Sequence, residues 1–458
     1  MSTTETLARA QAPMPPVAEL PEIMVRFAAD PVSELAALTQ RFGPVFRLPL
    51  GAEATVFLNE GSIAEKVLRL DFSSFGMSQQ TERLNRPLLG RSMPVTSDQR
   101  YWEELHAVIL PMFTPAMLKS YFTETVKVVA EEVEHLAKAA REGRTVPLLD
   151  FVRTGVFTAL SRTLFARGVS TEDIPRLLSL FESSNRYMSM RYLQGEAADV
   201  SEEPPIVAGR KALADLDAYI RRLIAQRRDE PPAEAQDMLD VLVGARTPAG
   251  RALDDDEVRD NVMALFFGGQ ETTPSVITWA LGLLSAHPDK REQLEEEVDR
   301  VLGDRTPTWE DLKALKYADM VLDETVRLYP PFSFVGREAL EDVELGDFHV
   351  PAGSPIAFVG WTIHRNPADW PDPEVFEPSR HVDELRKVRN RCAFVGFGYG
   401  QRRCTGERVG RMEGVLMLAM IAQRLRLDRV GGGLSAHQVM MAIKPADGMP
   451  VTVSERRR

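Results

Sequence analysis

One short stretch carries residues whose types and spacing could do chemistry, residues 397–406 (FGYGQRRCTG). Glycines at Gly398, Gly400 and Gly406 allow backbone conformations closed to other residues and a close approach to a flat partner. A helical pattern starts just behind Cys404, and the free N–H groups and positive end of a helix favour a thiolate over a thiol. Cys404 is therefore predicted to be a metal ligand or a nucleophile, and this stretch alone leaves both open.

A second stretch, residues 266–274 (FFGGQETTP), lies inside a long helical pattern. Gly268 and Thr272 are four residues apart and share a helix face. Each glycine in a helix interior costs about 1 kcal/mol relative to alanine, and Pro274 withholds an N–H from the preceding turn. A helix loosened in this way opens a groove beside the hydroxyl of Thr272 and the carboxylate of Glu271, which suits binding a small molecule and supplying it with protons. A simple kink in a core helix explains these residues equally well.

A third pattern is Glu324-x-x-Arg327, in which the two charges share one helix face and can pair. Arg380, in the stretch 376–380 (FEPSR), is a third candidate partner. An exposed pair of this kind contributes little to stability, and the Glu-x-x-Arg pattern occurs often by chance. The pattern alone predicts no function.

The elements that position these stretches are predicted from hydrophobic periodicity, which indicates a mainly α chain with small β-sheets. A hairpin is expected over 45–59, strands over 338–358 and a closing hairpin around 445–448, whereas 71–100 and 365–396 read as irregular. Asp254 and Glu257 resemble a capping box at the start of the longest helix. The predicted helices cover 61–70, 101–112, 115–142, 149–167, 172–188, 205–228, 236–244, 255–286, 289–302, 309–315, 317–329 and 405–426.

The composition excludes several classes of protein. The chain has 458 residues, 44% of them hydrophobic, and no long linker after residue 20, which predicts a flexible arm over 1–20 and a single domain over 21–458. The net charge of −12 argues against nucleic acid as a partner. Two cysteines, Cys392 and Cys404, favour a reducing cytoplasm, and seven scattered histidines disfavour a zinc site. The N-terminus resembles neither a signal peptide nor a membrane anchor.

Read in order, the glycine-rich helix with its acid–threonine pair, Glu-x-x-Arg, Phe-x-Pro-x-Arg and Phe-Gly-x-Gly-x-Arg-x-Cys-x-Gly resemble a cytochrome P450. The resemblance covers the chain from about residue 40. It implies a cytochrome P450 fold with haem b (iron protoporphyrin IX) between the long glycine-interrupted helix and the cysteine-loop helix. It also implies a soluble, bacterial-type haem-thiolate monooxygenase that uses O₂ to hydroxylate or epoxidise a hydrophobic small molecule.

Two alternatives stay open beside this activity. The same chemistry serves desaturation, ring coupling or decarboxylation in some members of the family. A haem-binding sensor or carrier without turnover is the other alternative, against which the Gly268–Thr272 groove speaks.

The resemblance assigns roles to the residues of the motifs. Cys404 would be the axial ligand of the iron, with Phe397, Gly398 and Gly406 around it, whereas Cys392 would be structural. The haem propionates would be bound by Trp102, His106, Arg337 and Arg402.

On the other side of the haem, Gly268 would leave room above the iron. Thr272 would hold a water or hydroperoxide, and Glu271 would connect it to solvent. Glu324, Arg327 and Arg380 would form a structural salt-bridge triad rather than a catalytic one.

Apolar residues at matching positions are candidates for the substrate pocket. They are Phe75, Met77, Ala264, Leu265, Phe332, Phe334, Val335 and Met441.

A basic segment, residues 380–411, stands out in this acidic chain, with nine Lys and Arg against three Asp and Glu. Basic charge near the cysteine loop would attract an acidic electron donor. We therefore expect a separate ferredoxin or flavodoxin, with its reductase, to supply two electrons to a monomeric enzyme that has no flavin or ferredoxin domain of its own. Arg402 is expected to turn inward to a propionate, and Arg403 outward to the donor.

Overall fold

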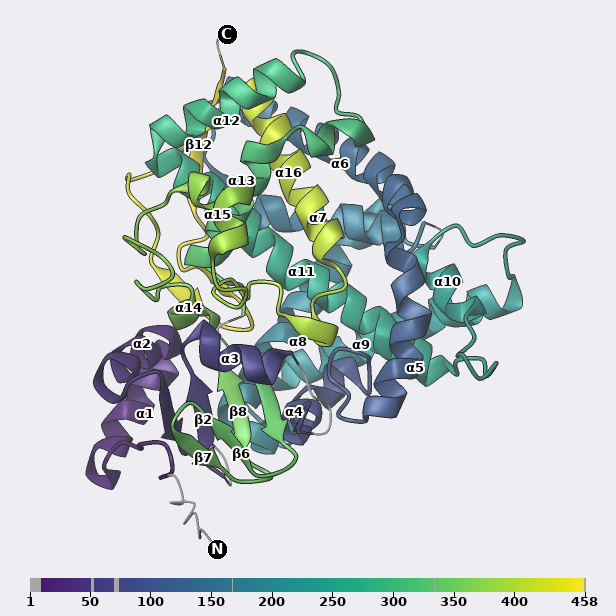
Figure 1. Ribbon diagram of the computed structural model, residues 1–458. Coiled ribbons are helices and arrows are strands. Elements are labelled where there is room, and N and C mark those ends of the chain that lie inside the picture. Colours follow the sequence, from purple (N-terminus) through teal and green to yellow (C-terminus); the bar gives the residue numbers. More distant parts are fainter. Residues whose placement is uncertain (1–9, 51–52, 70–73, 167, 333, 457–458) are drawn as a thin grey trace, which may run out of the picture.

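The computed structural model describes residues 10–50, 53–69, 74–166, 168–332 and 334–456, and helix α11 (Asp255–Ala286) runs through the middle of the molecule (Figure 1). At about 1.5 Å per residue this helix is nearly 50 Å long. The predicted capping box starts it. Asp254 accepts a hydrogen bond from the N–H of Glu257 at 2.8 Å, and the Glu257 carboxylate accepts one from the N–H of Asp254 at 2.9 Å.

Most of the other helices agree with the predicted ranges to within a few residues at each end. Near the N-terminus they are α1 (Leu20–Ala29), α2 (Pro31–Phe42), α3 (Gly61–Leu68), α4 (Gln79–Leu89), α5 (Gln99–Ile109), α6 (Pro115–Arg141) and α7 (Leu148–Leu164). They continue with α8 (Ile174–Gln194), α9 (Pro204–Asp229), α10 (Met238–Gly244), α12 (Pro288–Val301), α13 (Lys316–Leu328), α14 (Gly360–Ile363), α15 (Asp383–Val388) and α16 (Glu407–Arg424).

The strands form small sheets at the edge of this helical body, as predicted. The largest has the order β1-β2-β8-β5-β3 and lies beside α1 and α2 (Figure 1). Its strands are β1 (Val45–Leu48), β2 (Thr55–Leu58), β3 (Phe75–Gly76), β5 (Val335–Ala339) and β8 (Pro355–Phe358). The others are β4 (Val146–Pro147), β6 (Val343–Leu345), β7 (Phe348–Val350), β9 (Leu425–Arg429), β10 (His437–Val439), β11 (Ile443–Pro445) and β12 (Pro450–Glu455).

The segment 71–100, predicted to be one irregular loop, contains helix α4, so that prediction was wrong in its middle. Pro87 was read as a helix breaker, but it lies in the last turn of α4. A proline removes the N–H that would bond the carbonyl four residues earlier. Here Arg191 of α8 donates to that carbonyl, of Arg83, at 2.7 Å. A contact from a distant helix therefore satisfies the group that the proline leaves open.

The closing hairpin around 445–448 was also wrong. β11 pairs with β10, and β12 pairs instead with β9 and β4. The turn between β11 and β12 is fixed by Asp447, which pairs with Arg429 at 2.7 Å and accepts a hydrogen bond from Ser435 at 2.6 Å. These long-range contacts direct β12 away from β11.

The N-terminal segment is described from residue 10 onward, and residues 1–9 of the expected arm lie outside the described residues. Gln11 forms a β-bridge with His349, Ala12 is buried, and the N–H of Arg47 donates to the carbonyl of Pro13 at 2.8 Å. In the part of the chain that the structure describes, no helix is long and apolar enough to cross a membrane.

Candidate functional site

The cysteine loop follows β8 and α14 in sequence and leads into α16. Gly398 and Gly400 have φ of 71° and 73°, in the region that favours glycine, and a Cβ at Gly400 would lie 2.2 Å from the carbonyl oxygen of Leu68. Gly406 has φ of −80°, so its glycine is not required by backbone conformation. The N–H of Cys404 donates to the carbonyl of Phe397 at 2.8 Å, which closes the loop and turns the cysteine toward the interior.

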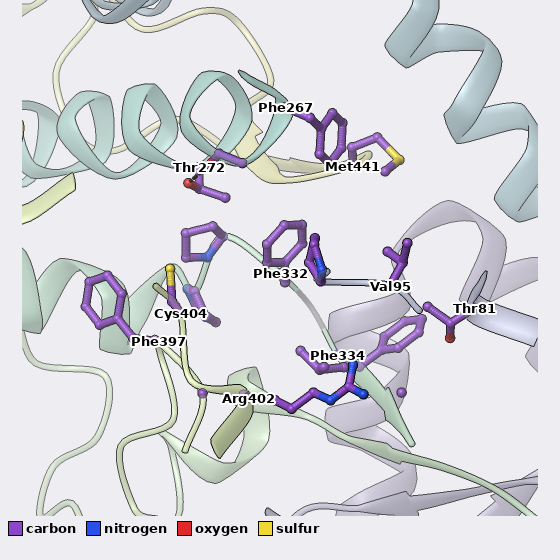
Figure 2. A pocket seen from close by; sticks show the side chains of 18 of the residues that line it. Thr81, Val95, Phe267, Thr272, Phe332, Phe334, Phe397, Arg402, Cys404 and Met441 are labelled. Atoms are coloured by element: carbon purple, nitrogen blue, oxygen red, sulfur yellow. Dashed lines mark hydrogen bonds between the residues drawn. The ribbon is translucent and has the colours of Figure 1, made fainter. Parts of the chain in front are cut away.

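The sulfur of Cys404 is exposed to a cavity and points toward α11 (Figure 2). Burial raises the pKa of its thiol, while hydrogen bonds from the backbone of Gly406 and Glu407 act in the opposite direction. The helix terminus therefore lowers the cost of a thiolate without removing it, and a bound cation would supply the rest. Cys392 is fully buried, and burial raises its pKa to about 12, which is typical of a packing residue.

A cavity of about 840 Å³ extends from the cysteine loop past α11 to α1 and the end of β1. Thr272 and Cys404 lie on opposite sides of it, and Arg402 lies at its edge (Figure 2). The candidate pocket residues Met77, Ala264, Leu265, Phe332, Phe334, Val335 and Met441 all line this cavity.

Phe75 does not line the cavity, and the prediction for it was wrong. It is 2% exposed on β3 and belongs to the apolar cluster beneath the sheet. The alternation of strand β3 explains the difference, because neighbouring side chains in a strand face opposite ways.

Two buried arginines face the cavity without an acidic partner among the described residues. Arg337 is 3% exposed, its Nη1 donates to the carbonyl of Gly336 at 2.8 Å, and its Nε has no hydrogen-bond partner. Arg402 donates to the carbonyl of Thr96 at 3.0 Å and to Gln99 at 3.3 Å. Burial lowers the pKa of Arg337 to about 10. Two desolvated cations with free donors form a site for a pair of anionic groups.

Trp102 and His106 lie beside this cationic pair on α5. Their rings stack at 4.6 Å between centroids, and the Arg402 guanidinium lies 4.8 Å from the centre of the Trp102 ring. Burial lowers the pKa of His106, and the charge of Arg402 lowers it further. His106 is therefore neutral at neutral pH and can act there as a hydrogen-bond donor but not as a cation.

The glycine pair of α11 divides between two tasks. A Cβ at Gly268 would meet nothing within 4 Å, so this glycine leaves space in the cavity. A Cβ at Gly269 would lie 2.9 Å from the side chain of Leu160, so that glycine lets α11 pack against α7. Thr272 donates its hydroxyl proton to the carbonyl of Gly268 at 2.6 Å, which fixes the oxygen at the cavity wall.

Glu271 points away from the cavity and is 1% exposed. Its carboxylate accepts a hydrogen bond from Asn185 of α8 and lies 2.5 Å from the ammonium of Lys444 on β11. The side chain of Lys444 is 15% exposed, so it is the part of this cluster that reaches solvent. Sequence reasoning missed Asn185 and Lys444, because both come from elements distant from α11 in the chain.

Glu324, Arg327 and Arg380 come together as one buried cluster beneath the cysteine loop. Arg327 donates twice to Glu324 at 2.8 Å, and the Nε of Arg380 lies 3.5 Å from the same carboxylate. His381 is a fourth member, 2.9 Å from Glu324, which the sequence reasoning missed although it directly follows Arg380. The N–H of Glu377 also donates to Glu324 at 2.9 Å. The cluster ties α13 to the irregular segment that leads to the cysteine loop.

The basic segment is partly neutralised. Arg386 and Arg411 pair with Asp323, Arg403 pairs with Glu407 at 2.7 Å, and Arg380 belongs to the Glu324 cluster. Three of its exposed cations have no ion pair among the described residues: Lys387, Arg391 and Arg408.

The residues present fit a haem. A cysteine sulfur faces the cavity from a loop that supplies N–H donors, two unpaired guanidinium groups lie at the edge of the same cavity, and a glycine leaves room opposite the sulfur. This donor set suits a flat, iron-centred group with two carboxylates. The cavity beyond it is mostly apolar.

Comparisons with known proteins agree with this geometry. The sequence model of the family "Cytochrome P450" matches residues 11–446. The cyclooctat-9-en-7-ol 5-monooxygenase of Streptomyces melanosporofaciens is 33% identical over 76% of this chain and 75% of its own length, and the cyclooctatin synthase of the same organism is 28% identical over 88% and 87%. The solved haem domain of cytochrome P450DA superposes with a TM-score of 0.87 over 98% of both chains, at 23% identity.

Proposed function

Because the chain belongs to the cytochrome P450 family, we propose that it hydroxylates or epoxidises a neutral, apolar, ring-containing molecule with electrons from a separate ferredoxin or flavodoxin. Members of this family are monooxygenases that use haem b, O₂, a hydrophobic substrate and a redox partner. The observation that carries the proposal is the apolar cavity with Cys404 on one side and Thr272 on the other.

Haem held by a cysteine thiolate supplies the oxygen chemistry in this family. In this chain, Cys404 would be the ligand and Arg337 and Arg402 would bind the carboxylates of the haem. The backbone N–H groups that reach the sulfur would stabilise its charge. Thr272, whose oxygen is fixed at the cavity wall, would hold a proton close to the bound oxygen.

Glu271 and Lys444 would form the proton supply. The carboxylate is buried, and the ammonium that pairs with it is the one group of the cluster with part of its surface in solvent. A proton would enter at Lys444 and reach Glu271 when their ion pair opens. Asn185 would keep the carboxylate in place during this exchange.

The substrate proposal rests on the character of the cavity wall. The charged side chains that line the cavity, among them Arg337, Arg402, Arg403 and Glu407, gather on the side of the cysteine loop and the bound haem. A charged substrate would therefore find no partner near α4 and α8, where the wall is neutral. One relative is named for oxidising cyclooctat-9-en-7-ol, an unsaturated alcohol, and we extend this class of neutral molecule to the chain.

The electron donor would bind at the basic segment. Lys387, Arg391 and Arg408 are the cations of this segment that no described acidic residue neutralises. An acidic ferredoxin or flavodoxin would be attracted to them over a distance limited by salt.

A screen of neutral polycyclic compounds against the purified haem protein tests the proposal. A ligand that displaces water from the iron shifts the Soret band, and we expect terpenoid compounds to do so. Products of turnover are then weighed by mass spectrometry. A gain of one oxygen supports the proposed reaction, whereas a loss of hydrogen or of carbon would show desaturation, ring coupling or decarboxylation.

A further inference from the structure

Helices α4 and α8 meet at the wall of the cavity, and a buried arginine holds them together. Arg191 is 3% exposed, donates to the carbonyls of Arg83 and Leu84 on α4 at 2.7 and 2.5 Å, and pairs with Asp199 at 2.6 Å. The next residue along α8 is Tyr192. The position of this tyrosine beside α4 is therefore fixed by its neighbour rather than by its own contacts.

The side chain of Asn85 on α4 is bonded to Tyr192 in an orientation that the backbone determines. Its amide nitrogen donates to the carbonyl oxygen of Thr81 at 2.9 Å and to the hydroxyl oxygen of Tyr192 at 2.6 Å. A backbone carbonyl can only accept, so the nitrogen and not the oxygen of the amide must face it. Both amide protons are then in use, and the oxygen of Tyr192 acts as an acceptor.

The hydroxyl proton of Tyr192 is left to point elsewhere. Among the described residues there is no acceptor for it, and burial raises the pKa of Tyr192, so the proton stays on the oxygen. Tyr192 and Asn85 both line the cavity, next to apolar residues such as Leu84, Leu193 and Val95. A hydrogen-bond donor without a partner in an apolar wall is a recognition group for an acceptor.

The place of this donor relative to the reacting end is also defined. Thr81, which lies one helical turn before Asn85, is on the wall of the cavity away from Cys404 (Figure 2). A ligand oxygen bound by Tyr192 would therefore lie at the far end of the ligand from the carbon that faces Cys404.

We propose that Tyr192, oriented by Asn85, donates a hydrogen bond to an oxygen of the substrate, and that the substrate is an apolar molecule that already carries a hydroxyl or carbonyl group away from the carbon to be oxidised. The inference rests on the proposed function and defines its substrate class. An earlier oxygenation or hydration reaction must then supply the substrate, because hydrocarbon skeletons lack this acceptor.

Ligand pairs that differ by one hydroxyl group test the inference. The haem-loaded protein is titrated with cedrol and cedrane, and with phyllocladanol and phyllocladane, while the Soret shift is followed. A neutral hydrogen bond contributes about 1 kcal/mol, so the wild type should bind the alcohol of a pair roughly fivefold more tightly than the hydrocarbon. Tyr192→Phe should lose this preference by weakening the alcohol alone.

Two further variants separate recognition from packing. Asn85→Asp places an acceptor beside Tyr192, takes up its proton and should also abolish the preference although the hydroxyl remains. Tyr187→Phe is the matched control on the same helix, because Tyr187 donates to Asp199 at 2.6 Å and does not line the cavity. It should leave the preference unchanged.

The outcomes distinguish the inference from the proposed function. If both members of a pair shift the Soret band and their affinity ratio is the same in wild type and Tyr192→Phe, the inference is wrong and the proposed function stands. If no member of either pair shifts the band, the proposed substrate class is wrong, and the inference falls with it.

Discussion

Arg337 and Arg402 face the same cavity as two buried cations that repel each other. Burial, together with the charge of Arg337, lowers the pKa of Arg402 to about 10. Arg337 comes from β5 and Arg402 directly precedes Arg403 in the cysteine loop, so the fold brings the two guanidinium groups together from distant parts of the chain. Such a pair is stable only if anionic groups lie between or beside them, which defines the position of the haem carboxylates.

The first prediction concerns retention of haem. Arg402→Gln and Arg337→Gln each remove a charge-assisted hydrogen bond of about 1.5–3 kcal/mol, so haem should transfer to apomyoglobin at least roughly tenfold faster than from the wild type. Arg403→Gln is the matched control, because Arg403 pairs with Glu407 outside this site. Equal transfer rates for the Arg402 and Arg403 variants would contradict the assignment of inward and outward arginines.

The second prediction concerns Thr272. Thr272→Ala removes the hydroxyl that is fixed at the cavity wall, so product formed per O₂ consumed should fall by roughly a hundredfold, near the lower end of the range for a positioned proton donor. Thr272→Ser should retain most of the coupling. The control is Thr278→Ala, because Thr278 makes the same kind of bond to the carbonyl of Pro274 at 2.7 Å but does not line the cavity. Unchanged coupling in Thr272→Ala would exclude the assigned role.

A third prediction follows from Glu413 of α16. Burial raises the pKa of its carboxyl to about 8. An unfolded glutamate ionises above about pH 4.3, so between pH 4.3 and 8 the unfolded state loses this proton while the folded state keeps it. The free energy of unfolding of the wild type should therefore decline in this window, by at most about 1.4 kcal/mol per pH unit.

The variant Glu413→Gln cannot ionise and lacks this decline. Urea unfolding of both proteins at pH 5 and pH 8 measures the difference, and the variant should gain relative to the wild type at the higher pH. A constant difference between the two proteins across the window would show that Glu413 does not titrate in this way.

The sequence predicted the helices best where a strong apolar period coincides with a capping signal, as for α11 with Asp254 and Glu257. It failed at α4, because the donor that compensates for Pro87 is Arg191, more than a hundred residues away in the chain. It also failed at the C-terminus, where the side chain of Asp447 directs the turn. Local patterns carry no information about partners of this kind.

The candidate site shows the same division. The residues of the cysteine loop and Thr272 could be chosen from their motifs, because glycine, cysteine and threonine stand at fixed spacings. Lys444, His381 and Tyr192 could not, because each acts through a partner on another element. Phe75 was misplaced because a residue in a short strand is buried or exposed to the cavity according to register, which the sequence does not define.

The fourth prediction concerns electron transfer. Arg391→Glu and Arg408→Glu reverse cations that have no described acidic partner, so reduction by an acidic ferredoxin or flavodoxin should slow by about tenfold at low salt. The effect should shrink as salt rises, because screening shortens the range of these charges. Lys211→Glu on α9 makes the same change of charge on another element and should leave the rate unchanged. A loss of rate that is equal in all three variants would exclude a specific docking surface.

The central claim is that Cys404 is the thiolate ligand of the haem iron. The most direct test is the absorption spectrum of the reduced, CO-bound protein, because a thiolate ligand shifts the Soret band strongly to the red. The wild type and Cys392→Ser, which alters the buried cysteine away from the cavity, should both show this band, and Cys404→Ser should lose it while haem can still bind. A red-shifted band that persists in Cys404→Ser, or is absent from the wild type, would contradict the claim.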